Sequence, residues 1–161
     1  METQGRLIVD VVRLSKGGEW FRGETAPELL ELGESEFVTP EGGMMYAVHV
    51  QIFDTELLVR GKVSQRMACI CSRCADTFET EIGESDFIHS IEINATTDFV
   101  DLTEEVREAI ILALPGYPVC RETCKGLCMT CGANLNKTTC RCRENGNDDR
   151  WAALGGLGIE N

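Results

Sequence analysis

The chain has 161 residues and a mass of 17.8 kDa, which fits one domain of ordinary size. It carries 15 Lys and Arg residues against 27 Asp and Glu residues, and this net charge of −12 argues against a protein whose whole surface binds nucleic acid or an anionic membrane. Hydrophobic residues make up 43% of the chain, which is enough for a core and argues against wholesale disorder. No apolar run could span a bilayer, and residues 1–12 lack the features of a secretion signal, so we expect neither membrane association nor export.

The first quarter of the chain contains few regular elements. Residues 6–14 are rich in β-branched side chains, which predicts a strand. Residues 26–32 fit one or two helical turns, with Thr25 as the N-cap and Pro27 in the first turn. The acidic, glycine-containing segment 34–43 is predicted to be a loop.

Alternating side chains predict three further strands, which we expect to form an antiparallel meander. Residues 44–53 fit a well-buried strand, and Asp54-Thr55 can turn the chain. In residues 57–71 the apolar side chains share one face and basic side chains share the other, as in a half-buried strand with a basic outer face. Residues 77–93 continue as a strand with a bulge or bend at Gly83.

One helix of about three to four turns is predicted after these strands. Asp101 and Glu104 have the spacing of a capping box, in which Asp101 accepts the backbone amide of Glu104. Apolar residues follow at helical spacing from Leu102 to Ala113, and Pro115 ends the run. The sequence therefore predicts an α+β fold, with a mainly antiparallel sheet and one covering helix.

Composition changes abruptly after Pro115, where cysteine, glycine, asparagine and threonine replace most core residues. A stretch with so little apolar area needs something other than a hydrophobic core to order it. We therefore divide the chain into an α+β body, residues 1–115, and a cysteine-rich, zinc-binding C-terminal tail, residues 116–161. The tail is expected to end in a short helix over residues 149–157 that docks on the body through Trp151, Leu154 and Leu157.

Nine cysteines in a chain without an export signal indicate metal or thiol chemistry rather than disulfides. Cys128 and Cys131, followed by Gly132, have the spacing of a zinc knuckle, in which backbone amides donate to the sulfurs and the glycine adopts a positive φ. Cys140 and Cys142 supply a second close pair. Together the four thiols predict the first metal site.

Two further cysteine pairs remain, Cys71 with Cys74 and Cys120 with Cys124. By counting, they can complete a second four-sulfur site that joins the sheet to the chain leaving the helix. The alternative is that one or both pairs are ordinary buried or reduced thiols. Cys69 is left over, and its place in the strand alternation predicts a core residue.

Basic residues concentrate in the two stretches that contain all nine cysteines. Residues 57–75 contain four basic and no acidic residues, and residues 120–150 contain six basic and four acidic residues. If the second site forms, it brings the two stretches together as one basic face for phosphate groups, whereas the acidic remainder would suit a basic protein. The residues predicted to contact RNA or another partner are Arg60, Lys62, Arg66, Arg73, Lys125, Lys137, Arg141 and Arg143.

No catalytic residues can be identified from the sequence. It contains no phosphate-cradling glycine loop and no nucleophile motif, and no pair of carboxylates is placed for acid–base work. His49 and His89 are expected to be surface or core residues rather than ligands. The same holds for the aromatic residues, which are expected in the core rather than as platforms for bases: Trp20, Phe21, Tyr46, Phe53 and Phe78.

Four segments carry a resemblance to a known family: Cys71–Cys74, Glu104–Pro115, Cys124–Asn136 and Asp149–Leu154. They look like the YceD family, whose members are called large ribosomal RNA subunit accumulation proteins, and the match runs from about residue 57 to 157. The resemblance implies a cytoplasmic, non-enzymatic factor for synthesis, processing or stability of 23S rRNA, acting on that RNA or on the pre-ribosomal large subunit. Because family members often neighbour the gene for a small basic ribosomal protein of the large subunit, that protein is a candidate partner.

A second hypothesis stays open from the sequence. The protein would be a redox or iron–sulfur protein that uses Cys71 and Cys74 or the tail cysteines. Some relatives of the family lack the cysteine-rich tail, so the metal need not carry the role that the family shares. Iron bound by thiolates is coloured and zinc is not, which separates the two hypotheses.

Overall fold

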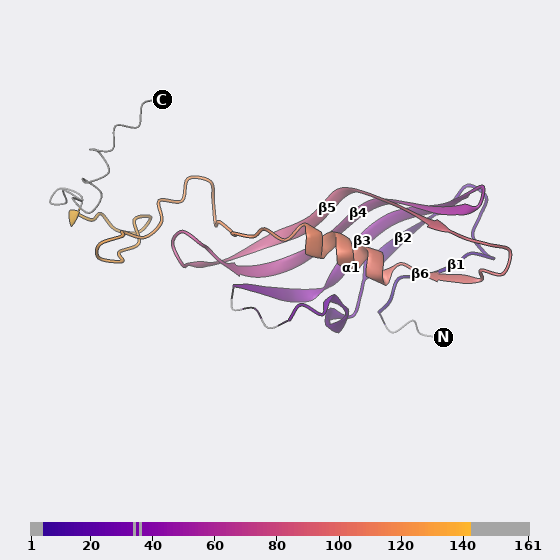
Figure 1. The fold of residues 1–161 in the computed structure, drawn as a ribbon, viewed down its shortest axis with the longest axis horizontal. Helices are drawn as coiled ribbons and strands as arrows, with labels where there is room; N and C mark the ends of the chain where they lie inside the picture. The colour runs from indigo at the N-terminus through magenta and orange to yellow at the C-terminus, as the bar shows by residue number, and fades with distance from the viewer. Residues whose placement is uncertain (1–4, 34, 36, 143–161) are drawn as a thin grey trace, which may run out of the picture.

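The computed structural model describes residues 5–33, 35 and 37–142. A four-stranded antiparallel sheet in the order β2-β3-β4-β5 forms the body, and a small two-stranded sheet pairs β1 with β6. Helix α1 lies across one face of the larger sheet, and the chain after it leaves the end of that sheet as the tail (Figure 1). The elements are β1 (Ile8–Asp10), β2 (Glu19–Glu24), the 3-10 helix η1 (Pro27–Leu30), β3 (Val38–Phe53), β4 (Glu56–Ile70), β5 (Thr77–Glu92), β6 (Phe99–Asp101) and α1 (Thr103–Leu112).

The predicted fold class and antiparallel meander are confirmed. Strands β3 and β4 are joined by a tight turn in which Asp54 has a φ of 56°, and β4 returns as β5 through residues 71–76. The register between β4 and β5 shifts where Gly61 pairs with Phe87 and Val63 with Glu84. Ser85 and Asp86 of β5 here oppose Lys62 alone, so β5 has one extra residue and the predicted bulge is present, two residues beyond Gly83.

The strands differ from their predicted bounds at three places. The predicted strand over residues 6–14 is only the three residues of β1, because β6 offers a partner of the same length. The predicted loop 34–43 is too long, since β3 already begins at Val38 and pairs with the far end of β4. Strands β2 and β6 were not predicted, because their short segments show little alternation of apolar and polar residues.

The predicted helical turn near residue 26 is a 3-10 turn, and Thr25 does not cap it. No side-chain cap is formed at Ala26. Instead the Thr25 hydroxyl oxygen accepts the backbone amide of Met44 at 3.0 Å, in a buried position beside β3. Thr25 therefore joins the turn to the sheet.

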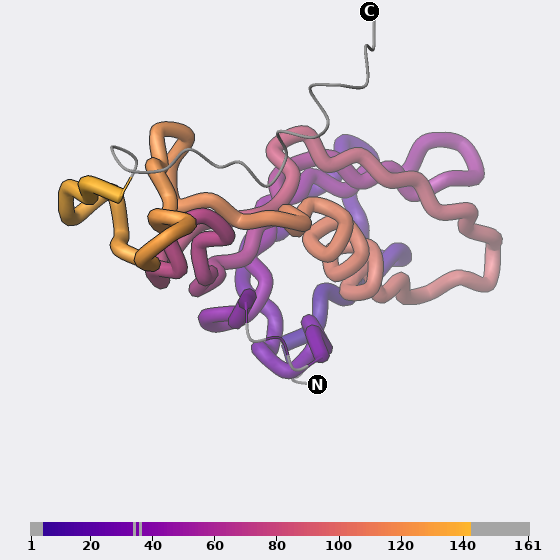
Figure 2. The backbone as a smooth tube through the Cα atoms, turned by 60° about the vertical axis from the view of Figure 1, so that its left-hand side comes forward, coloured from indigo at the N-terminus to yellow at the C-terminus, as the bar shows by residue number. Residues whose placement is uncertain are grey.

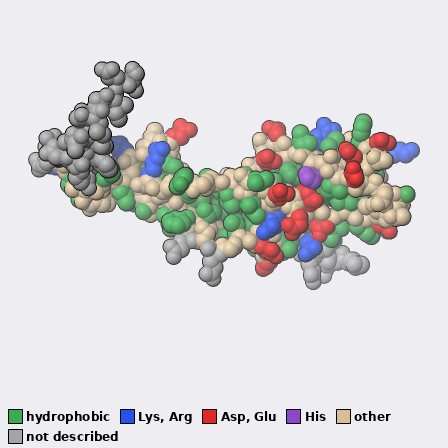
Figure 3. Space-filling view, in the orientation of Figure 1, with side chains coloured by type: hydrophobic (Ala, Val, Ile, Leu, Met, Phe, Trp, Pro, Cys, Tyr) green, Lys and Arg blue, Asp and Glu red, His purple; other side chains and the backbone are tan. Residues whose placement is uncertain are grey.

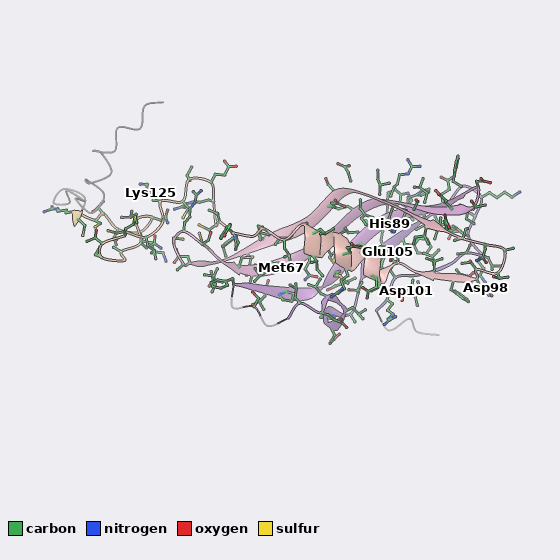
Figure 4. The ribbon with its side chains drawn as sticks, viewed as in Figure 1. Met67, His89, Asp98, Asp101, Glu105 and Lys125 are labelled. Atoms are coloured by element: carbon green, nitrogen blue, oxygen red, sulfur yellow. The ribbon has the colours of Figure 1, made fainter. Side chains whose placement is uncertain are left out.

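The core lies between the inner face of the sheet and α1. Alternate residues of β4 are fully buried there, including Met67 and Cys69, so the prediction of Cys69 as a core residue is confirmed. Helix α1 contributes Val106 and Ile110, both 0% exposed, at the predicted helical spacing. Figure 4 shows Met67 and His89 on the sheet, with Glu105 of α1 beside it.

The start of α1 differs from a capping box by one residue. The helix begins at Thr103, and Asp101 accepts the backbone amide of Thr103 at 3.0 Å rather than that of Glu104. Arg6 donates to the other carboxylate oxygen of Asp101 at 3.0 Å. Asp101 therefore connects the helix start to the chain that leads into β1.

Substitution of Ile110 by alanine tests the contribution of this core. Ile110→Ala removes a fully buried side chain, so we expect the free energy of unfolding to fall by about 2–5 kcal/mol. Leu112→Ala on the same helix is the control, because Leu112 is 77% exposed and its loss should change stability by less than about 0.5 kcal/mol. Urea unfolding followed by circular dichroism measures both, and equal effects would contradict this placement of the helix.

Candidate metal centre

Four thiols meet at the end of the sheet where the tail begins, and we call them the proximal cluster: Cys71, Cys74, Cys120 and Cys124. The first pair lies in the turn after β4, and the second lies in the chain after α1. The four sulfur atoms lie within 4.8 Å of one another, and the Cys71–Cys124 and Cys74–Cys120 sulfurs are each 3.8 Å apart. Zinc–sulfur bonds of about 2.3 Å in a tetrahedron place sulfurs about 3.8 Å apart, so the cluster fits such an ion.

Backbone and side-chain amides point at these sulfurs. The backbone amide of Cys120 donates to the Cys71 sulfur at 3.4 Å, and the Asn136 side chain donates to the Cys124 sulfur at 3.4 Å. The turn itself is closed by the Ala75 amide, which donates to the Cys71 carbonyl at 2.9 Å. Amide donors of this kind stabilise negative charge on sulfur, as metal-bound thiolates require.

The proximal cluster is shielded from water. Cys71 and Cys74 are each 2% exposed and Cys124 is 7% exposed. Phe78 of β5 and Val119 pack around them as a small core separate from the main one. A cluster of this kind can hold the tail against the sheet without a large apolar area.

Without an ion, the four thiols cannot all ionise. Burial disfavours the Cys71 thiolate, but backbone amides including that of Cys120 outweigh it and lower the pKa of Cys71 to about 6. Burial, together with the adjacent Cys71 and Cys124 thiols, raises the pKa of Cys120 to about 12. A bound cation would remove this conflict, and protons would compete with it as the pH falls.

The second set of thiols, the distal cluster, lies farther along the tail: Cys128, Cys131, Cys140 and Cys142. The Cys140 sulfur is 3.4 Å from the sulfurs of both Cys128 and Cys131. Gly132 has a φ of 72°, and its amide donates to the Cys128 carbonyl at 2.9 Å, as the knuckle spacing predicts.

The distal cluster is more exposed than the proximal one, and its loop is attached to the turn after β4. The Leu127 amide donates to the Arg73 carbonyl at 2.9 Å. Asp76 accepts the Asn134 side chain at 3.0 Å and forms an ion pair with Lys137 at 2.7 Å. Figures 1 and 2 both show the tail running beyond the end of the sheet, close to the body only near this turn.

The predicted contact residues that the structure describes are all exposed, but they do not form one compact face. Arg60 and Arg66 are separated by about 20 Å along β4, from the rise of a strand, and Lys125 lies out on the tail (Figure 4). Lys62 forms an ion pair with Glu81 at 2.6 Å, and Arg73 donates to the Glu122 carbonyl at 3.1 Å. The basic residues thus follow the long axis of the molecule. Two further predictions, the contact residue Arg143 and the helix over residues 149–157, lie outside the described residues.

Two aromatic residues predicted in the core are exposed. Trp20 is 55% exposed and Phe53 is 71% exposed, because both lie on the face of the sheet that α1 does not cover.

The asparagines at positions 134 and 136, which bond to the turn after β4 and to the Cys124 sulfur, were not predicted as functional. Their signals in the sequence are their place shortly after the Cys131-Gly132 knuckle and their position in the segment Cys124–Asn136, which carries the resemblance to the family.

With this geometry in view, comparison with known proteins identifies the family. A profile described as "Large ribosomal RNA subunit accumulation protein YceD" matches residues 59–158. The chain belongs to this family. The matched range includes both cysteine clusters and most of β4.

Curated relatives from plants and mycobacteria also match. A chloroplastic "Large ribosomal RNA subunit accumulation protein YCED homolog 1" is 36% identical over 58 residues in Arabidopsis thaliana, and its Zea mays counterpart is 38% identical over 71 residues. These matches cover 36% and 44% of this chain but only 18% and 23% of the plant proteins. An uncharacterized Mycobacterium tuberculosis protein is 25% identical over 92% of this chain and 79% of its own length. No solved structure matches the chain significantly.

The second hypothesis was a redox or iron–sulfur protein that uses Cys71 and Cys74 or the tail cysteines, and it is not favoured. Redox pairs of this spacing usually open a helix, whereas these two thiols follow a strand and lie beside Cys120 and Cys124.

Among the described residues, no helix is long and apolar enough to cross a membrane.

Elemental analysis of the purified full chain tests the two clusters. We expect two ions per chain in the unmodified protein, one for each cluster. Each of the double variants Cys71→Ser/Cys74→Ser and Cys128→Ser/Cys131→Ser should retain one ion. Cys69→Ala is the control and should retain both ions, because Cys69 belongs to the core. The ions should dissociate as the pH is lowered, since the thiols then regain their protons. One ion in the unmodified protein would leave one cluster as free thiols.

Proposed function

We propose that this protein is a non-enzymatic, cytoplasmic ribosome-biogenesis factor that supports synthesis, processing or stability of 23S rRNA, with structural zinc in its tail. The observation that carries the proposal is the family match over residues 59–158, which includes both cysteine clusters. The names of the plant relatives state a role in accumulation of the large ribosomal RNA subunit. The proposal extends that role to this chain and assigns it no reaction.

The donor set favours zinc as the metal. Four cysteine sulfurs are a common ligand set for structural zinc, which is tetrahedral and does not change its oxidation state. When bound, zinc supplies a cross-link and the positive charge that four thiolates need. The chain itself supplies the amide donors, such as Asn136 to Cys124, and joins the two clusters through Asp76. On this proposal the purified protein has no visible absorption band, and such a band would indicate iron instead.

The outer face of β4 is the proposed contact with 23S rRNA or the pre-ribosomal large subunit. Arg60, Lys62 and Arg66 alternate with the buried residues Val59 and Val63, so their side chains point away from α1. All three are exposed, and Arg60 and Arg66 form none of the ion pairs found within the described residues. The proposed contact continues along the tail through Arg73, Lys125, Lys137 and Arg141.

The acidic surface supports a second partner within the same function. Asp and Glu side chains are spread over the side of the body that Figure 3 shows. With a net charge of −12, this surface suits a small basic ribosomal protein of the large subunit. Binding of such a protein would leave the basic residues of β4 free for RNA.

Charge reversal on β4 tests the RNA contact. The triple variant Arg60→Glu/Lys62→Glu/Arg66→Glu should bind 23S rRNA more weakly, and the plot of log affinity against log salt should become less steep by about 2, because three phosphate contacts are lost. Arg13→Glu/Lys16→Glu is the matched control, since both residues are exposed and precede β2. Filter binding across a salt series measures both, and equal binding by the triple variant would reject this face.

Depletion of the protein in its own cells tests the wider function. We expect the ratio of 23S to 16S rRNA to fall, because unsupported large-subunit RNA is made, processed or preserved less well. Wild type and the Arg13→Glu/Lys16→Glu control should restore the ratio, and the triple variant should not. An unchanged ratio after depletion would contradict the proposed function, whereas rescue by the triple variant would contradict only the β4 contact.

A further inference from the structure

The face of the sheet opposite α1 carries an aligned row of aromatic and basic side chains. Trp20 of β2 is the register partner of His49 of β3, and His49 is the partner of Arg60 of β4. The Trp20 and His49 rings meet edge to face with centroids 5.5 Å apart, which places both on the same face. The row therefore crosses three strands of the sheet.

Trp20 lies at the β2 end of this row, on the edge strand of the sheet. Its side chain is 55% exposed, although tryptophan is among the most costly side chains to leave in water. The guanidinium of Arg22 lies 4.9 Å from the centre of its ring, a cation–π arrangement that supports the indole from one side. A flat ligand can stack against the rest of the exposed ring.

The charges around Trp20 differ from those of the molecule as a whole. Arg22, Arg60 and Lys62 occupy two adjacent rows of the outer face on β2 and β4, and no carboxylate from β2, β3 or β4 lies in those rows. The acidic groups of this face lie beyond those rows: Glu24 of β2 is one row past Arg22, and on β5 Glu81 pairs with Lys62 at 2.6 Å and the exposed Asp86 lies in the bulge. A chain with a net charge of −12 thus gathers cations where its tryptophan is exposed.

An exposed aromatic ring surrounded by cations matches the chemistry of single-stranded nucleic acid. Bases stack on aromatic rings with little dependence on sequence, and the flanking phosphates bind Arg and Lys. A basic protein would be repelled by the same cations, so the charges favour RNA over a protein at this face. Paired RNA hides its bases within the helix and cannot use the indole in this way.

We propose that Trp20, His49 and Arg60 form a stacking platform for an unpaired segment of RNA, with Arg22 and Lys62 as further phosphate contacts. The inference rests on the proposed function, in which RNA is the partner. It goes beyond that function because it assigns a base-stacking residue on β2, outside the matched family range of residues 59–158. It also names the form of RNA that is bound.

Fluorescence of Trp20 provides the test. The chain contains two tryptophans, so the full-length Trp151→Phe protein reports on Trp20 alone. A short single-stranded RNA oligonucleotide should quench this fluorescence to saturation, and the same sequence as a duplex should quench it much less. In fluorescence anisotropy with a labelled oligonucleotide, Trp20→Ala should bind about tenfold or more weakly, and Trp20→Phe should retain most of the affinity.

Tyr117→Ala is the matched control, because Tyr117 is an aromatic residue of the tail that is 84% exposed. It should bind like wild type. The platform is overturned if Trp20→Ala binds the oligonucleotide as tightly as wild type, or if the oligonucleotide does not quench Trp20 fluorescence. This holds even if charge reversal on β4 still weakens 23S rRNA binding. If the wild type binds neither the oligonucleotide nor 23S rRNA, both the platform and the RNA contact fail. If Trp20→Ala loses binding to a basic ribosomal protein but keeps its binding to RNA, the face would be reassigned to a protein partner.

Discussion

The proximal cluster is the constraint on which the tail depends. After Pro115 the chain has few apolar residues, and the small core around Cys71, Cys74 and Cys124 contains only two partly buried apolar side chains besides cysteines. Four sulfur atoms at tetrahedral spacing replace the apolar area that this region lacks. Because one pair of thiols belongs to the turn after β4 and the other to the chain after α1, this single arrangement determines where the tail leaves the body.

The distal cluster is built on the proximal one. Its loop bonds to the backbone carbonyls of Arg73 and Cys74, and Asp76 receives both Asn134 and Lys137. All of these acceptors lie in the turn that the proximal thiols shape. Since the distal thiols are also more exposed, the position of the distal loop depends on these anchors in the turn.

Much of this architecture could be predicted because its signals are local. The alternation in β4 and the helical spacing of Val106 and Ile110 identified the buried faces, and cysteine counting grouped the thiols correctly. The exposure of Trp20 could not be predicted, since the short segment of β2 shows little alternation of apolar and polar residues and was not recognised as a strand. The single compact basic face was also not found, because β4 spreads its basic residues along its length and Lys125 lies out on the tail, whereas a count of charges in a stretch ignores this extension.

On the proposed function, the uneven charge limits where the protein can contact long RNA. A net charge of −12 repels phosphate over most of the surface, so non-specific binding by the body is weak. Most exposed cations of the described residues lie on the outer face of the sheet and along the tail, and on that face Lys62 is partly neutralised by Glu81. On the proposed platform, phosphate attraction alone is then modest, and stacking on Trp20 supplies the rest of the affinity. The proposed surface would select RNA whose bases are unpaired, as in large-subunit RNA before its helices and proteins are in place.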